Sequence, residues 1–390
     1  MADESKPVVI VTGSSGYLGA AVVRRLHGSY RVVGLDRYSP PHPPHQAECV
    51  CFDITDQASV DTALDRVRLA YGDSIAACIH LAAYFDLTGE DDPAYDAVTV
   101  EGSKRLLNGL QEFKLEQFVF ASTMLAHAAT EPGQPISEDH PFDPKLPYRA
   151  SKVRTESMLR EERGDEKLVL MRPAGIYDDK GQSTFLTRQI ARIHEKRFSG
   201  RVYPGDLSRG QAFLHLEDFL DAVERIVDRR AKLPDVFPVL LGESDPIPFG
   251  DLQRLIGREL HGEDWITWNV PPRLAKLGTW TENKILGEDA FIRSWMVDIS
   301  SDHYELDLSA AKKHLDWTPQ HSLREDMPGI LQRLKDDPYE WYEVNGLNAA
   351  RVSASKVENA AAEEAAEKAP TEAEANENRR EHEDPMRQMH

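Results

Sequence analysis

The chain is poor in cysteine and has no long apolar run. Its 390 residues include three cysteines, Cys49, Cys51 and Cys78. All three lie in apolar, strand-like runs, which favours buried thiols in a reducing compartment over a disulfide or a metal site. No apolar run approaches the roughly 20 residues that span a bilayer, and residues 1–6 have the features of neither a signal nor a transit peptide. We therefore expect a cytoplasmic protein with no membrane partner and no metal.

Basic residues are also scarce relative to acidic ones. Lysine and arginine number 46 against 66 aspartates and glutamates, which gives a net charge of −20. A field of this sign repels phosphates and argues against nucleic acid as a partner, except where local donors overcome it. The length allows one large domain or two modest ones with a substantial core.

The most informative motif follows the first apolar run, residues 8–12. Gly13, Gly16 and Gly19 follow that run in the spacing Gly-x-x-Gly-x-x-Gly. A bound pyrophosphate requires a sharp strand-to-helix turn, backbone without a Cβ in the way, and the free N–H groups of a helix N-terminus. Apolar residues at helical spacing come next, over 20–26. The pattern predicts a dinucleotide-binding turn.

The second predicted strand ends at Asp36, about 20 residues after the first glycine, as this motif requires. Its carboxylate is placed to accept hydrogen bonds from a ribose 2′-hydroxyl and would repel a 2′-phosphate. NAD is therefore favoured over NADP as the cofactor, although the adjacent Arg37 leaves NADP open.

Short apolar strands alternate with helical segments from residue 8 to about residue 177, which predicts a parallel sheet covered on both faces. The fold class is α/β, with a Rossmann-type doubly wound parallel sheet in residues 1–178, to which residues 212–242 return. The predicted strands are 8–12, 31–35, 48–52, 76–81, 117–121 and 168–172.

The regular alternation declines after residue 178. Amphipathic helices separated by loops predict a smaller C-terminal α/β substrate lobe over residues 179–347, with helices at 186–197, 217–229, 249–260 and 324–335. Residues 348–390 hold few large apolar side chains, so they are expected to form a disordered, charged tail.

Tyr148 has a lysine, Lys152, four residues on. Positions i and i+4 share a helix face, so the ammonium can sit beside the phenol and lower its pKa. Ser122 and Thr123 end the strand 117–121, at the carboxyl edge where ligands bind in such folds. Tyr148 can then exchange a proton with a substrate oxygen that accepts a hydrogen bond from Thr123, while a nicotinamide moves the hydride. These four residues are the predicted catalytic set.

Taken together, these motifs resemble the extended short-chain dehydrogenase/reductase superfamily. This group includes NAD-dependent sugar epimerases and dehydratases and reductases similar to 3β-hydroxysteroid dehydrogenase. The resemblance covers residues 7–345 and rests on residues 12–19, Asp36, 52–56, 79–83, 122–123, 148–152, 172–177 and 212–218.

The resemblance also implies roles for individual residues. Ser15, Tyr17 and Leu18 would join the three glycines at the cofactor, and Asp53 and Ile54 would flank the adenine. Leu81, Ala82 and Ala83 would line the pyrophosphate and nicotinamide ribose, and Lys152 would hold the ribose hydroxyls. Pro173 and Ala174 would lie near the carboxamide. Arg172 could form a structural salt bridge and is not placed in the site.

Three positions depart from the pattern of the relatives. Thr99 stands where many have asparagine, and His127 takes a substrate-facing position where tyrosine is usual. Gln211 replaces the arginine with which nucleotide-sugar enzymes commonly grip a diphosphate; Arg209 could substitute out of register. The candidates for substrate contact are Tyr84, Met124, His127, Tyr177, Arg209 and Gln211.

Three functions remain open from the sequence. The first is an NAD-dependent epimerase or dehydratase acting on a sugar or nucleotide sugar. The second is an alcohol dehydrogenase or ketone reductase of the hydroxysteroid or dihydroflavonol reductase type, which releases its cofactor after each reaction. The aromatic residues of the substrate lobe suit it, among them Trp265, Trp268, Trp280, Phe291 and Trp295. The third is an NAD-sensing protein without activity. The resemblance further implies a homodimer formed by helices around 95–111 and 148–163.

Overall fold

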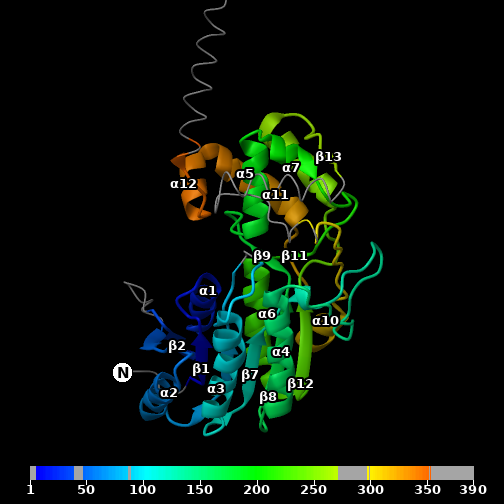
Figure 1. Cartoon of the computed structure of the whole chain (residues 1–390). Helices are drawn as coiled ribbons and strands as arrows, with labels where there is room; N and C mark the ends of the chain where they lie inside the picture. The colour runs from blue at the N-terminus through cyan, green and yellow to red at the C-terminus, as the bar shows by residue number, and fades with distance from the viewer. Residues whose placement is uncertain are drawn as a thin grey trace, which may run out of the picture. The chain divides into compact units, whose positions relative to one another are not determined.

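The computed structural model describes residues 6–38, 47–86, 89–270, 297, 299–350 and 352 (Figure 1). By its internal contacts the chain forms two compact units, residues 1–331 and 332–390. The domain boundaries at 178 and 347 stay predictions. Most of the expected tail, together with Trp280, Phe291 and Trp295, lies outside the described residues.

The first unit is organised by a seven-stranded sheet in which every neighbouring pair is parallel. In spatial order its strands are β12 (Val236–Leu241), β8 (Lys167–Pro173), β7 (Gln117–Ala121), β5 (Ala77–His80), β1 (Val8–Thr12), β2 (Arg31–Asp36) and β3 (Ala47–Cys51). All six predicted strands are present. The seventh, β12, comes from the segment expected to return to the first domain.

Helices cover both faces of this sheet (Figure 1). Alternate residues of β1 point in opposite directions: Val9 and Val11 pack into one core, and Val8 and Ile10 into the other. The first core contains residues of α1 (Tyr17–Leu26), α6 (Leu216–Asp228) and α10 (Ser309–Leu315), and the second contains residues of α2 (Gln57–Tyr71), α3 (Glu101–Leu110) and α4 (Pro147–Glu162). Strands buried on both faces explain the nearly continuous apolar runs in the sequence.

The remaining elements of the first unit are short strands and helices. The strands are β4 (Ser74–Ile75), β6 (Lys114–Leu115), β9 (Gly175–Tyr177), β10 (Val202–Tyr203), β11 (Phe213–His215) and β13 (Trp268–Asn269). The helices are α5 (Thr184–His194), α7 (Phe249–His261), a π-helical turn at Tyr95–Val100, and 3₁₀ turns at Met124–Ala126, Phe198–Arg201 and Arg230–Lys232. Helix α11 (Leu323–Asp336) continues into the second unit, which also contains α12 (Pro338–Val344).

The predicted glycine turn joins β1 to α1. Gly13 has φ +68°, a conformation that costs other residues energy. At Gly19 a Cβ would overlap the carbonyl oxygen of Gly13, so the helix can approach the turn this closely only with glycine there. The first and third glycines are therefore required by the backbone itself.

The cysteines differ from expectation in one respect. Cys78 is buried and Cys49 partly buried, but Cys51 is exposed at the end of β3, an edge strand of the sheet. The Cys51 thiol donates to the Arg37 carbonyl, with Sγ 3.7 Å from the oxygen.

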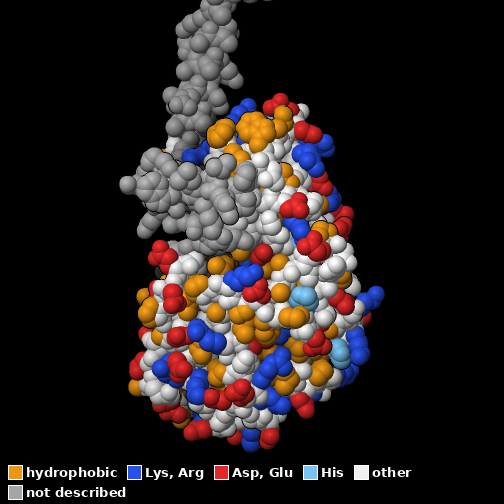
Figure 2. All heavy atoms as spheres, turned by 45° about the vertical axis from the view of Figure 1, so that its right-hand side comes forward, with side chains coloured by type: hydrophobic (Ala, Val, Ile, Leu, Met, Phe, Trp, Pro, Cys, Tyr) orange, Lys and Arg blue, Asp and Glu red, His pale blue; other side chains and the backbone are white. Residues whose placement is uncertain are grey.

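Charged side chains of both signs are spread over the face shown in Figure 2. No helix within the described part of the chain combines the length and apolar character needed to cross a membrane.

We predict that Gly19→Ala lowers the free energy of unfolding by about 1–3 kcal/mol, the usual cost of forcing an extra group into packed structure. Gly28→Ala is the control, because a Cβ at Gly28 meets no atom within 4 Å. Urea unfolding followed by circular dichroism measures both variants. Equal stabilities would contradict the close approach of helix and turn.

Candidate active site

The catalytic residues predicted from the sequence come together at the carboxyl end of β7. The Lys152 ammonium donates a hydrogen bond of 2.7 Å to the carbonyl of Ala121, the last residue of that strand. Its Nζ lies 5.8 Å from the centre of the Tyr148 ring. Thr123 follows two residues after Ala121 and is buried. One turn of α4 thus brings Lys152 and Tyr148 to the strand end that leads to Thr123.

The electrostatics differ from those expected. Burial lowers the pKa of Lys152 from 10.5 to about 7, and burial raises the pKa of Tyr148 above its ordinary value. The sequence predicted that Lys152 would lower the tyrosine pKa. The ammonium is bonded to a neutral carbonyl instead, and the removal of both groups from water dominates.

The hydroxyls of Ser122 and Thr123 differ in their hydrogen bonding. Thr123 Oγ1 accepts the N–H of Leu125 at 3.2 Å and so caps the 3₁₀ turn at Met124–Ala126. Ser122 Oγ is buried and has no hydrogen-bond partner among the described residues. Its hydroxyl therefore retains an unused donor and acceptor at the strand end.

The cofactor residues fit a dinucleotide. The first turn of α1 has no side-chain cap and no acidic residue, so its N–H groups are open to an anion. At the end of β2, the Asp36 carboxylate accepts the N–H of Ser15 at 2.9 Å and of Tyr38 at 3.3 Å, which fixes the acid beside the turn. Arg37 is exposed and stacks on the ring of Tyr38.

The other residues expected at the cofactor are found in the first turn of α1 and at strand ends and loops of the same unit. Tyr17 is partly exposed, and its hydroxyl donates to Asp178 at 2.8 Å. The Asp53 carboxylate accepts two bonds from Thr55, which lower its pKa. Leu18, Leu81, Ala82, Ala83 and Pro173 are partly buried, whereas Ile54 and Ala174 are buried.

A hydrogen-bond chain that the sequence did not reveal supports this edge of the sheet. His80, fully buried at the end of β5, lies 2.6 Å from Thr12 Oγ1 through Nδ1 and 2.8 Å from Ser103 Oγ through Nε2. Ser103 donates to the Thr99 carbonyl, so its oxygen accepts from His80 Nε2–H, and Nδ1 accepts from Thr12. Burial lowers the His80 pKa to about 3, which keeps the ring neutral.

His127 does not face a substrate, and that expectation is wrong. Its ring is fully buried, with Nδ1 donating to the His140 carbonyl at 2.8 Å and Nε2 accepting from Arg172 at 3.1 Å. Arg172 in turn forms a buried bidentate pair with Glu156. The arginine is structural, and it draws the histidine into the same buried network.

The other substrate candidates are divided between the interior and the surface. Met124 is buried in the core, and Tyr177 is buried with its hydroxyl donating to Asp326 at 2.7 Å, so neither offers a surface to a ligand. The Tyr84 hydroxyl donates to Asp92, and Arg209 pairs with Glu131. Only Gln211 lines the pocket described next.

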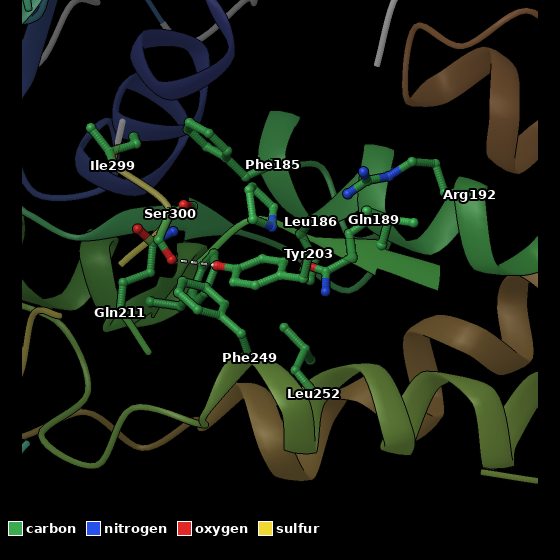
Figure 3. Close-up of a pocket in the computed structure, with 13 residues that line it drawn as sticks. Phe185, Leu186, Gln189, Arg192, Tyr203, Gln211, Phe249, Leu252, Ile299 and Ser300 are labelled. Atoms are coloured by element: carbon green, nitrogen blue, oxygen red, sulfur yellow. Dashed lines mark hydrogen bonds between the residues drawn. The ribbon is translucent and has the colours of Figure 1, made fainter. Parts of the chain in front are cut away.

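A pocket lies between α5, the β10 strand and the start of α7 (Figure 3). Its walls are mainly aromatic and aliphatic, and Gln189, Gln211 and Arg192 add polar groups. The Tyr203 ring lies 5.5 Å from that of Phe249, and its hydroxyl donates to the Ser300 carbonyl at 2.8 Å. The lining residues are Phe185, Leu186, Gln189, Arg192, Val202, Tyr203, Pro204, Gln211, Phe213, Phe249, Leu252, Ile299 and Ser300. The sequence missed most of them because they come from separate segments without a motif.

His215, His321 and Asp326 place potential metal ligands within 4.8 Å of one another. The hydrogen bonding opposes a metal there. His215 Nδ1 accepts the N–H of Glu217 at 3.2 Å, which leaves the proton of the neutral ring on Nε2. Nε2, which lies 3.4 Å from the Asp179 carboxylate, then carries a proton and has no lone pair for an ion.

Comparison with known proteins agrees with this geometry. Residues 9–239 match the NAD dependent epimerase/dehydratase family. The chain is 31% identical to UDP-glucose 4-epimerase of Mycolicibacterium smegmatis over 229 residues, 55% of this chain and 72% of that protein. It is 26% identical to 3-beta-hydroxysteroid dehydrogenase of Mycolicibacterium neoaurum over 230 residues, 56% of this chain and 61% of that protein.

Solved structures share the fold. The UDP-glucose 4-epimerase of Thermus thermophilus in complex with NAD superposes with a TM-score of 0.63 at 19% identity, covering 85% of this chain and 99% of that one. The UDP-glucuronic acid 4-epimerase of Bacillus cereus, in complex with UDP-glucuronic acid and NAD, gives 0.63 at 17% identity, covering 84% and 99%.

The lowered pKa of Lys152 makes a prediction about stability. Between about pH 7 and 10.5 the unfolded chain holds a proton on this lysine that the folded chain does not, so stability rises with pH through this window. Wild type should therefore gain stability relative to Lys152→Met between pH 7 and pH 10, as measured by urea unfolding. Lys114→Met is the control, since Lys114 is exposed. A pH-independent difference for Lys152→Met would contradict the burial of its charge.

Proposed function

Because the chain belongs to the NAD-dependent epimerase/dehydratase family, we propose that it epimerises or dehydrates a nucleotide sugar through a transient ketone, using Thr123, Tyr148 and Lys152. The observation that carries this proposal is the bond from Lys152 to the Ala121 carbonyl, which holds the helix turn of Tyr148 against the strand end that leads to Thr123.

The residues divide the proton chemistry among them. Tyr148 takes the proton of a substrate hydroxyl, and Thr123 donates a hydrogen bond to the same oxygen as it becomes a carbonyl. NAD, when bound, supplies the hydride acceptor and returns the hydride. Lys152 contributes positive charge next to Tyr148 while it is protonated. The Asp36 carboxylate favours a free ribose hydroxyl over a 2′-phosphate, which supports NAD rather than NADP.

The pocket supports recognition of the part of the substrate that does not react. The rings of Tyr203 and Phe249 offer stacking surfaces for a planar group, and the amides of Gln189 and Gln211 offer hydrogen bonds to its edge. UDP-sugars, named with several of the relatives, have such a group.

Gln211 favours a second candidate, oxidation of an apolar alcohol or reduction of the matching ketone with release of the cofactor. A neutral amide at this position cannot match the charge of a diphosphate, and most of the described pocket wall is apolar. The similarity to a 3-beta-hydroxysteroid dehydrogenase points the same way.

The dinucleotide retained during purification distinguishes the two candidates. An epimerase or dehydratase regenerates its cofactor in each cycle and can keep it bound. We predict near-stoichiometric NAD or NADH when protein purified without added cofactor is denatured and the released dinucleotide is identified by mass spectrometry. An empty site would favour the dehydrogenase or reductase that releases its cofactor, and it would direct substrate tests to alcohols and ketones.

We predict that Tyr148→Phe abolishes turnover while NAD affinity changes little, because only the reacting oxygen is removed. Turnover of UDP-glucose and calorimetric titration with NAD measure the two quantities. Tyr339→Phe is a control, since that tyrosine is 50% exposed and lies on α12. A comparable loss of NAD binding in Tyr148→Phe would mean that the tyrosine is structural.

A homodimer through the helices of residues 95–111 and 148–163 remains a proposal from the family resemblance. The cytoplasmic location remains a prediction from the sequence.

A further inference from the structure

The turn that carries Tyr148 is not held by a helix cap. Helix α4 starts at Pro147, and its N-cap residue, Leu146, has no side chain that can accept an N–H bond. Caps normally fix the first turn of a helix by satisfying its free N–H groups. The position of Tyr148, the second residue of the helix, must therefore be fixed by contacts from its neighbours.

Arg149, the next residue along α4, makes one set of these contacts. It is 2% exposed, and its Nη1 donates a 3.0 Å hydrogen bond to the hydroxyl of Tyr304. The Tyr304 hydroxyl donates to Asp302 at 3.2 Å, and Arg149 Nη1 lies 3.6 Å from the same carboxylate. A buried guanidinium is tolerated only when paired, so these two partners fix the arginine in place. Its Nε and Nη2 have no hydrogen-bond partner among the described residues.

Tyr304 is itself held firmly by its backbone. Its N–H donates to the Gly210 carbonyl at 3.0 Å, and its carbonyl accepts the N–H of Ala212 at 2.9 Å. These bonds pair Tyr304 with Gln211, which lines the pocket. Tyr304, which lies 155 positions after Arg149 in the sequence, is thus anchored to the wall of the pocket.

We propose that Arg149 is a positioning residue that fixes Tyr148 to the pocket wall through Tyr304 and Asp302. The proposal rests on the proposed role of Tyr148. It adds a chain of contacts, the route, that fixes the position of the Tyr148 hydroxyl relative to the pocket. Nothing in the sequence motif around Tyr148 and Lys152 requires an arginine between them.

The first test compares Arg149→Met with Arg154→Met. Arg154 lies on the same helix, is 53% exposed and pairs with Asp96 at the surface. With UDP-glucose and NAD we expect Arg149→Met to lose on the order of 10- to 100-fold in kcat, the effect of a displacement of about 1 Å. NAD affinity should stay the same, Arg149→Lys should recover part of the loss, and Arg154→Met should resemble wild type.

A double-mutant cycle tests the route. Tyr304→Phe removes a single oxygen and keeps the ring, so it should fold even where Arg149→Met does not. If Arg149 acts through Tyr304, the double variant loses no more kcat than Arg149→Met alone. Losses that multiply would overturn the route.

A substrate-independent measurement separates this inference from the proposed function. With 3-fluorotyrosine at position 148, the ¹⁹F resonance should broaden or split in Arg149→Met and in Tyr304→Phe but remain a single sharp line in Arg154→Met. An unchanged line in both test variants, with only a lower melting temperature, would reduce Arg149 to a stabilising residue and overturn the proposal. Failure of wild type to turn over any nucleotide sugar would count against the proposed function alone.

Discussion

The buried polar face of α4 is the constraint on which the site depends. Of its six buried residues only Leu159 is apolar; the others are Arg149, Ser151, Lys152, Thr155 and Glu156. Charges removed from water must find partners, and these partners come from strands and loops far away in the sequence. Glu156 pairs with Arg172 of β8, and Lys152 with the end of β7. Apolar packing tolerates a helix that slides by a fraction of a turn, but paired charges do not. The register of Tyr148 against the sheet is therefore set by electrostatics.

The predictions from the sequence were correct where the signal is local and wrong where it depends on distant residues. The strands and the glycine turn were predictable because their signals are local: alternating burial along β1, and a backbone approach at Gly19 that only glycine allows. His127 was predicted wrongly because its environment is not local. Arg172 has more donors than Glu156 alone can satisfy, and the histidine ring accepts one of them. No pattern around residue 127 in the sequence reveals an arginine 45 positions away.

The charge state of the site depends on a similar balance. Lys152 donates to a carbonyl without net charge, and the Glu156 carboxylate offsets only part of the cost of burying its ammonium, so its pKa falls to about 7. Near neutral pH Lys152 is therefore only partly protonated. His80 stays neutral because burial, together with the nearby charge of Lys152, lowers its pKa to about 3.

The pocket is the part that the sequence conveyed least, because its walls are assembled from α5, β10, α7 and residues 299–300. Its charge nevertheless narrows the choice of substrate. Among the described lining residues Arg192 is the only cation. A diphosphate bound in this pocket would depend on that one guanidinium, whereas an apolar alcohol would not. If the proposed nucleotide sugar binds in this pocket, its recognition would rely more on stacking against Tyr203 and Phe249 than on charge, and its affinity would depend less on salt than pyrophosphate recognition by two arginines.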